Sequence, residues 1–171
     1  YLPLSKEKKI ICNIRARKEP LFVHAPSRSG IKGSNFIIEA IDKLKNTGYQ
    51  FTFEVIQNLT NSELLKKLSE ADILVDEVLL HGPGVLSSEA MLAGCAVATR
   101  TLEDHKDIFN PPVTSINPKN IHSQLKYLLD NFNYRIELAE KGREFAKLHN
   151  NPANIASEMI QNLTRDTCDY T

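Results

Sequence analysis

HGPGVLSSEAMLAG, residues 81–94, is the stretch that decides the fold of this chain. A short apolar run at 72–76 precedes it and another at 95–98 follows it. Runs of this length are typical of buried strands, and a Gly-Pro-Gly turn followed by helical spacing lies between them. A glycine turn that opens into a helix leaves backbone N–H groups free at the positive helix end. The stretch therefore predicts a strand–turn–helix–strand unit that can bind an anion.

Further strands and helices alternate on both sides of this unit. Five short segments have the composition of strands: 21–25, 50–56, 72–76, 95–98 and 113–116. Helical spacing follows the first strand, with Ser34 or Asn35 as the expected cap and Gly48 as the stop. Asn61 or Ser62 should cap a second helix. The pattern is helical again after residue 118.

This alternation predicts an α/β, Rossmann-like domain in which a parallel sheet has helices on both faces. We expect residues 21–171 to form the domain and residues 1–20 to be a lead-in segment. Parallel sheets bind ligands at the carboxyl ends of their strands. The loops at 26–33 and 80–85 follow strands, so both should lie on that edge of the sheet.

Length, net charge, apolar runs and cysteine content limit the classes of function that we expect for this chain. The 171 residues are enough for one domain, and 21 basic against 21 acidic residues give no net charge to attract nucleic acid or a membrane surface. No run of about 18 apolar residues is present. Cys12, Cys95 and Cys168 are odd in number and far apart, which favours a reducing compartment. We expect a cytoplasmic protein, and we expect this chain, which begins with Tyr1, to be a piece of a longer one.

The loop PSRSGIKG, residues 26–33, carries two cations after the first strand. Arg28 can hold a phosphate with a forked pair of donors, and Lys32 adds a point charge. Such charges would stabilise a diphosphate leaving group. The loop is not a Walker A motif, because the closing Gly-Lys-Ser/Thr is absent. A solvated basic loop is the open alternative.

Glu89 lies about one and a half turns into the expected helix, where a carboxylate can accept hydrogen bonds from sugar hydroxyls. A phosphorylated sugar nucleotide would suit both this carboxylate and the anion-binding turn. A surface glutamate after a tight turn is the alternative. Gly84, a glutamate five residues later, then Ala-Met and a further glycine form a more specific pattern than Gly-Pro-Gly alone.

Other polar residues have simpler interpretations. His24 ends a buried strand and is expected to be a hydrogen-bonded structural histidine. His81 is either a site residue or a turn residue. Asp72 and Asp76 flank a strand and are interpreted as polar strand-end groups, not as a metal pair. Neither a zinc-ligand spacing nor a nucleophile elbow is present.

The basic loop and the stretch around Glu89 together resemble the carboxyl-terminal, donor-binding domain of GT-B glycosyltransferases of the group 1 type. HAPS at 24–27 with IKG at 31–33 is similar to that family's first strand and Lys-Gly loop. ADILVD at 71–76 is similar to its ADIxVD strand, and GVLSSEAMLAG at 84–94 to its G-x-x-x-x-E-A-M-A-x-G segment. The similarity covers about residues 21–165.

Two positions depart from the pattern. His81 stands where many members carry a first glutamate, eight residues before the second. Ser27 stands where the family's arginine is usual, and Arg28 is one position further along.

The resemblance implies that Lys32 and Arg28 are catalytic residues that hold the departing diphosphate, and that Glu89 binds the nucleotide ribose. It implies phosphate contacts from the backbone at 84–86 and base contacts from the loop at 56–58. No metal and no cofactor are expected beside the UDP- or GDP-linked sugar. The full donor-binding set is Ser27, Gly33, Ile56, Gln57, Asn58, His81, Gly82, Pro83, Gly84, Val85, Leu86 and Glu89.

The implied reaction is transfer of a hexosyl group from a nucleoside-diphosphate sugar to a glycan or lipid-linked acceptor, with retention of configuration, in polysaccharide biosynthesis. An amino-terminal acceptor domain, outside this sequence, should complete the site and set any membrane association. The helix at 153–163 should return toward that domain with an exposed apolar face, and the fragment alone should catalyse little. Two alternatives stay open: a nucleotide-sugar 2-epimerase-like enzyme, and a non-catalytic Rossmann-like module that has lost donor binding.

Overall fold

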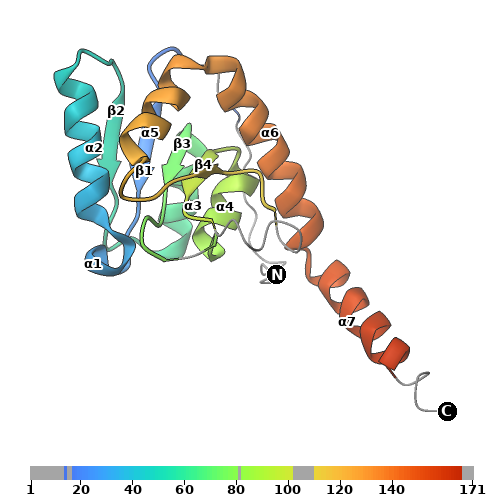
Figure 1. Cartoon of the computed structure of the whole chain (residues 1–171). Coiled ribbons are helices and arrows are strands. Elements are labelled where there is room, and N and C mark those ends of the chain that lie inside the picture. The colour runs from blue at the N-terminus through green and yellow to red at the C-terminus, as the bar shows by residue number, and fades with distance from the viewer. Residues whose placement is uncertain (1–13, 15–16, 81, 102–109, 167–171) are drawn as a thin grey trace.

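Five parallel strands form the central sheet of the computed structural model, which describes residues 14, 17–80, 82–101 and 110–166 (Figure 1). Neighbouring strands pair in the order β2-β1-β3-β4-β5, and every pair is parallel. The predicted α/β, Rossmann-like class is confirmed. The strands are β1 (Leu21–His24), β2 (Thr52–Val55), β3 (Ile73–Val75), β4 (Ala96–Thr99) and β5 (Thr114–Ser115).

The helices cover both faces of the sheet. α2 (Ser34–Asn46) and α5 (Ile121–Asp130) pack together on one face, and α3 (Asn61–Glu70) packs against α4 (Val85–Ala93) on the other (Figure 1). α1 (Ser29–Lys32) is a single turn between β1 and α2. α6 (Phe132–His149) packs against α4, α5 and β4.

Side chains alternate across the strands and so form two cores. Phe22, Ile73 and Val75 belong to the core under α2 and α5. Val23 follows Phe22 and Leu74 follows Ile73, and both belong to the core with α3 and α4. Both sets are fully buried, as expected for parallel strands that have helices on both faces.

The last helix, α7 (Pro152–Asp166), extends from the end of α6 away from the sheet (Figure 1). Met159 and Ile160 on α7 are 61% and 62% exposed, so the expected exposed apolar residues are present. Within the described ranges, none of the helices has the length and apolar character needed to cross a bilayer.

The expected helix caps were wrong by one residue. Gly33 is the N-cap of α2, and Ser34, the first helical residue, uses its hydroxyl to contact His24 instead. Thr60 caps α3 in a reciprocal capping box with Glu63. Most strands are also one to three residues shorter than their apolar runs, because hydrogen-bonded pairing ends before burial does.

The chain reverses its direction across the sheet between β1 and β3. From β1 it proceeds to β2 on one side, and the later strands add on the other side of β1. In α/β proteins, ligands bind outside the carboxyl ends of the strands at such a switch point. The loops that follow β1 and β3 meet there.

Candidate functional site

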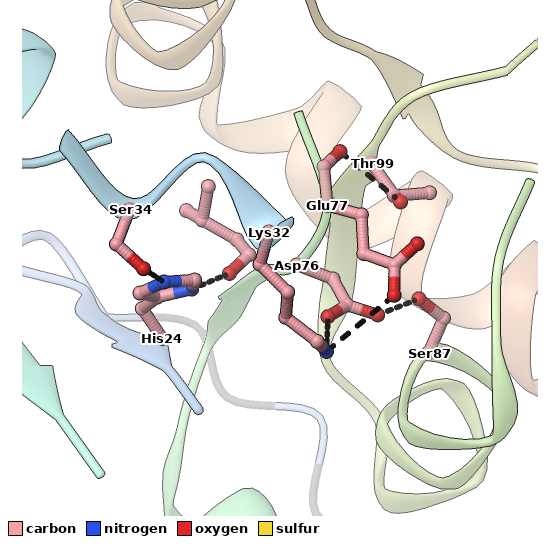
Figure 2. Close-up of polar contacts among 8 residues, drawn as sticks. His24, Lys32, Ser34, Asp76, Glu77, Ser87 and Thr99 are labelled. Carbon is pink, nitrogen blue, oxygen red and sulfur yellow. Dashed lines mark hydrogen bonds and ion pairs between the residues drawn. The ribbon is translucent and has the colours of Figure 1, made fainter. Parts of the chain in front are cut away.

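Lys32 is buried at the switch point and its charge is paired inside the protein (Figure 2). Its side chain, from α1, donates a hydrogen bond to Asp76 Oδ1 and lies 3.7 Å from Glu77 Oε1. Ser87 on α4 donates to the other oxygen, Asp76 Oδ2, at 2.7 Å. Asp76, which follows β3, therefore connects α1 with the first turn of α4. We call Lys32, Asp76, Glu77 and Ser87 the switch-point cluster.

His24 is fully buried beside this cluster at the end of β1 (Figure 2). Its Nδ1 lies 2.8 Å from the Val75 carbonyl oxygen and its Nε2 lies 2.8 Å from Ser34 Oγ. A carbonyl only accepts, so Nδ1 carries the proton and Nε2 accepts from the Ser34 hydroxyl. Burial lowers the pKa of His24, which keeps the ring neutral. The expected structural role is confirmed: the ring joins β1, β3 and α2.

Glu77 places a second carboxylate near Lys32. Burial raises the pKa of Glu77, the neighbouring Asp76 charge raises it further, and Lys32 opposes both. Lys32 therefore has one close ionic partner, Asp76, and a longer contact with a carboxyl group that holds its proton more readily than usual.

The two motif loops follow β1 and β3 on the same sheet edge, as predicted, and the residues directly after β3 pack against the end of the first loop. The Val78 backbone N–H donates to the Lys32 carbonyl at 3.0 Å. Gly33 has a φ of +75°, and a Cβ placed there would lie 3.0 Å from Leu79 Cγ and 3.2 Å from Val78 Cβ. Both the left-handed backbone and the close approach of the second loop require glycine at this position.

The amino end of α4 is uncapped. Gly84 is its N-cap residue in an extended conformation and supplies no side chain. The N–H groups of Val85, Leu86 and Ser87 have no acceptor among the described residues. Because Ser87 bonds to Asp76, these N–H groups lie beside the Lys32 ion pair. An uncapped helix end with a neighbouring cation is suited to an anion such as phosphate.

Glu89 is 2% exposed, which rules out the interpretation of a surface glutamate. Asn61 Nδ2 at the start of α3 donates to Glu89 Oε1 at 3.4 Å. Glu89 therefore lies at the contact between α3 and α4, one turn below the uncapped helix end. Its expected contact with a ribose stays a prediction.

The remaining predicted residues follow β1, β2 and β3 and so lie on one edge of the sheet. Arg28 is exposed and has no carboxylate partner among the described residues, in contrast to Lys32. Asn58 has a φ of +58° in the loop after β2. His81 is outside the described residues. Of the others, Ser27, Gln57 and Val85 are exposed, Ile56 is buried, and Gly82, Pro83, Gly84 and Leu86 are half-buried.

Asp76 and Ser87 are the residues whose role the sequence analysis missed. Asp76 was interpreted as a strand-end polar group, although a cation and an acid at the ends of adjacent parallel strands could have suggested their pairing. The described residues contain no group of three or more His, Cys, Asp or Glu side chains able to hold a metal ion.

Comparison with known proteins identifies the fold. No protein-family model and no curated protein matches this sequence. Among solved structures, TarM from S. aureus, determined with fondaparinux, α-GlcNAc-glycerol and UDP, aligns with a TM-score of 0.67 and 15% identity over 88% of this chain and 37% of that one. The carboxyl-terminal domain of LpcC, a group 1 glycosyl transferase from Francisella tularensis, aligns with a TM-score of 0.62 and 15% identity over 88% and 96%.

A protein from Listeria monocytogenes assigned as a UDP-N-acetylglucosamine 2-epimerase also aligns, with a TM-score of 0.55 and 14% identity over 77% of this chain and 43% of that one. The chain thus spans less than half of the larger proteins it matches, and nearly all of the isolated LpcC domain. It has the fold of the carboxyl-terminal domain of GT-B glycosyltransferases. The resemblance expected from the motifs is confirmed at the level of the fold.

Proposed function

We propose that this domain binds the nucleoside diphosphate of a sugar donor and is the donor-binding part of a hexosyltransferase. The observation that carries the proposal is the uncapped amino end of α4 beside Lys32, on the sheet edge that also carries Arg28. Diphosphate oxygens would accept hydrogen bonds from the N–H groups of residues 85–87. TarM, which has the same fold, was determined with UDP, and this supports a nucleotide as the ligand.

The proposed reaction moves the hexosyl group from the donor to a hydroxyl of a glycan or lipid-linked acceptor, with retention. The bond between the anomeric carbon and the diphosphate oxygen breaks, and negative charge grows on the leaving group. Arg28, exposed and without an ionic partner among the described residues, would bind that charge with its forked donors. Lys32 would share its charge between Asp76 and the diphosphate.

Calorimetric titration of the chain with UDP and with GDP tests this proposal. We expect saturable binding of one nucleotide, and Arg28→Gln should weaken it about tenfold, as loss of one charge-assisted contact does. Arg28 is exposed, so the variant should fold normally. Lys18→Gln removes an exposed cation that precedes β1 at the opposite sheet edge, and it should leave the affinity unchanged.

The second candidate is a module that has kept the fold and lost donor binding. The ion pair between Lys32 and Asp76 favours it, because a lysine already neutralised by the protein attracts a diphosphate less. A folded chain that binds neither UDP nor GDP would support this candidate and contradict the donor-site proposal.

A further inference from the structure

An open groove of about 700 Å³ lies at the carboxyl ends of β4 and β5, next to the candidate donor site. Arg100 and Thr101 after β4 line one side, and residues 113–120, which include β5, line the base. Gln124 of α5 and Tyr134 of α6 complete the wall. None of the predicted site residues lines this groove.

The described residues that line the groove carry two positive charges, Arg100 and Lys119, although the chain as a whole is neutral. None of the described residues that line it is Asp or Glu. Arg100 and Lys119 have no carboxylate partner among the described residues, whereas Lys43, Lys67 and Lys126 are all ion-paired. Arg100 Nη1 donates to the Leu79 carbonyl at 3.2 Å, which holds the guanidinium in place. An anionic group is therefore the complementary ligand.

Uncharged donors in the groove are also unused. Thr114 is 3% exposed, and its Oγ1 has no hydrogen-bond partner in the described part of the chain. A buried hydroxyl without a partner is rare in folded proteins. The Gln124 amide and the Tyr134 hydroxyl, within the same described part, have no partner either. Amide, hydroxyl and aromatic groups around two cations match a ligand that has both hydroxyls and a negative charge.

We propose that this groove binds a saccharide that bears an anionic group, either phosphate or carboxylate. Arg100 and Lys119 bind the charge, and Gln124 and Tyr134 bind the sugar hydroxyls. The Arg100 N–H donates to the Glu77 carbonyl at 2.7 Å, and the Gly82 N–H donates to the Arg100 carbonyl at 2.9 Å. The groove therefore adjoins the uncapped end of α4. The proposed saccharide site is separate from the proposed nucleotide site and binds a different ligand, a charged sugar.

NMR titration of the isotopically labelled chain, without any nucleotide, tests the groove. The probes are glucose 6-phosphate, glucuronate, neutral glucose and inorganic phosphate. We expect at least one of the two charged sugars to bind saturably, with shifts of amide signals at residues 114–124, and the preferred one identifies the anionic group. Lys119→Glu should weaken that binding about tenfold. Lys66→Glu, an exposed lysine on α3, is the matched control and should change nothing.

Three outcomes would overturn the assignment. If neither charged sugar gave saturable shifts, the groove would not be a binding site for them. Equal weakening by Lys66→Glu would show that the sugar is attracted by charge without a specific site. If inorganic phosphate bound as tightly as glucose 6-phosphate, the groove would recognise the phosphate and not the sugar. None of these results depends on UDP or GDP binding, so failure of this inference is distinguishable from failure of the donor-site proposal.

Discussion

Asp72 and Asp76 are both buried at opposite ends of β3, yet their partners differ. Asp72, at the amino end, accepts a hydrogen bond from the Leu21 backbone N–H at 2.7 Å and lies 3.5 Å from the 35% exposed Arg17. Asp76, at the carboxyl end, accepts from two side chains, Lys32 and Ser87. The first aspartate connects the start of β3 to the backbone of β1 and to the partly exposed Arg17. The second organises side chains on the edge where a ligand can bind.

The largest effect should come from breaking the carboxyl-end pair. Asp76→Asn keeps the shape of the side chain but removes the negative charge that balances the buried Lys32 ammonium, and the remaining carboxylate, Glu77, is 3.7 Å away. We expect a loss of about 3 kcal/mol in the free energy of unfolding, measured with urea. Lys32→Met with Asp76→Leu and Ser87→Ala should recover most of this loss, because the three apolar side chains leave neither a buried charge nor an unpaired hydroxyl. Equal stability of Asp76→Asn and the unmodified chain would contradict the buried pair.

Asp72→Asn is the matched change at the amino end of the same strand. It removes the charge from a hydrogen bond to backbone, while the 35% exposed Arg17 keeps its hydrogen bond to the Glu70 carbonyl, so we expect a smaller cost of about 2 kcal/mol. Nucleotide affinity should stay unchanged, since Asp72 lies at the far edge of the sheet. A larger loss than that of Asp76→Asn would reverse the comparison.

The difference between the two aspartates is also where the sequence analysis was weakest. Alternating apolar runs predict the sheet, and parallel topology places the loops after β1 and β3 together, because both properties follow from local pattern and chain direction. The pairing of Lys32 with Asp76 depends on how α1 turns back over β3, over a separation of 44 residues. Side-chain partners at that range are fixed by packing, not by local spacing.

Gly33, the left-handed glycine where the two loops meet, tests the packing at the carboxyl ends of the strands with a smaller expected loss of stability. Gly33→Ala forces a Cβ to within 3.0 Å of Leu79 Cγ at a φ of +75°. We expect a loss of about 1–2 kcal/mol in the free energy of unfolding. Gly30→Ala is the control in the same loop, because a Cβ there meets nothing within 4 Å. Similar losses in the two variants would show that the loops do not pack as described.

The same junction explains why the caps of α2 were mispredicted. Ser34 has the side chain of a good N-cap, but the buried His24 at the end of β1 needs a hydrogen-bond donor for its Nε2, and the Ser34 hydroxyl is that donor. Gly33 then becomes the cap residue because only glycine has the required backbone angles next to Leu79. Tertiary contacts at the site overrode the local preference.

A change of one pH unit should produce the smallest effect, and it acts at the carboxyl end through His24. Burial lowers the pKa of His24 in the folded chain, whereas the unfolded value is about 6.5. As pH falls below about 6.5, His24 binds a proton in the unfolded state but stays neutral in the folded state. The free energy of unfolding should therefore decrease, by at most about 1.4 kcal/mol per pH unit.

Glu77 contributes with the opposite sign. Its raised pKa means that the folded state holds a proton more tightly, so this contribution to stability is lost as pH rises from about 4.5 through the folded pKa. Urea unfolding of Glu77→Gln and of His24→Gln between pH 4.5 and 7.5 separates the two groups. Glu77→Gln should steepen the loss of stability on acidification, and His24→Gln should flatten it. An unchanged slope in His24→Gln would mean that the buried ring is not the group that titrates.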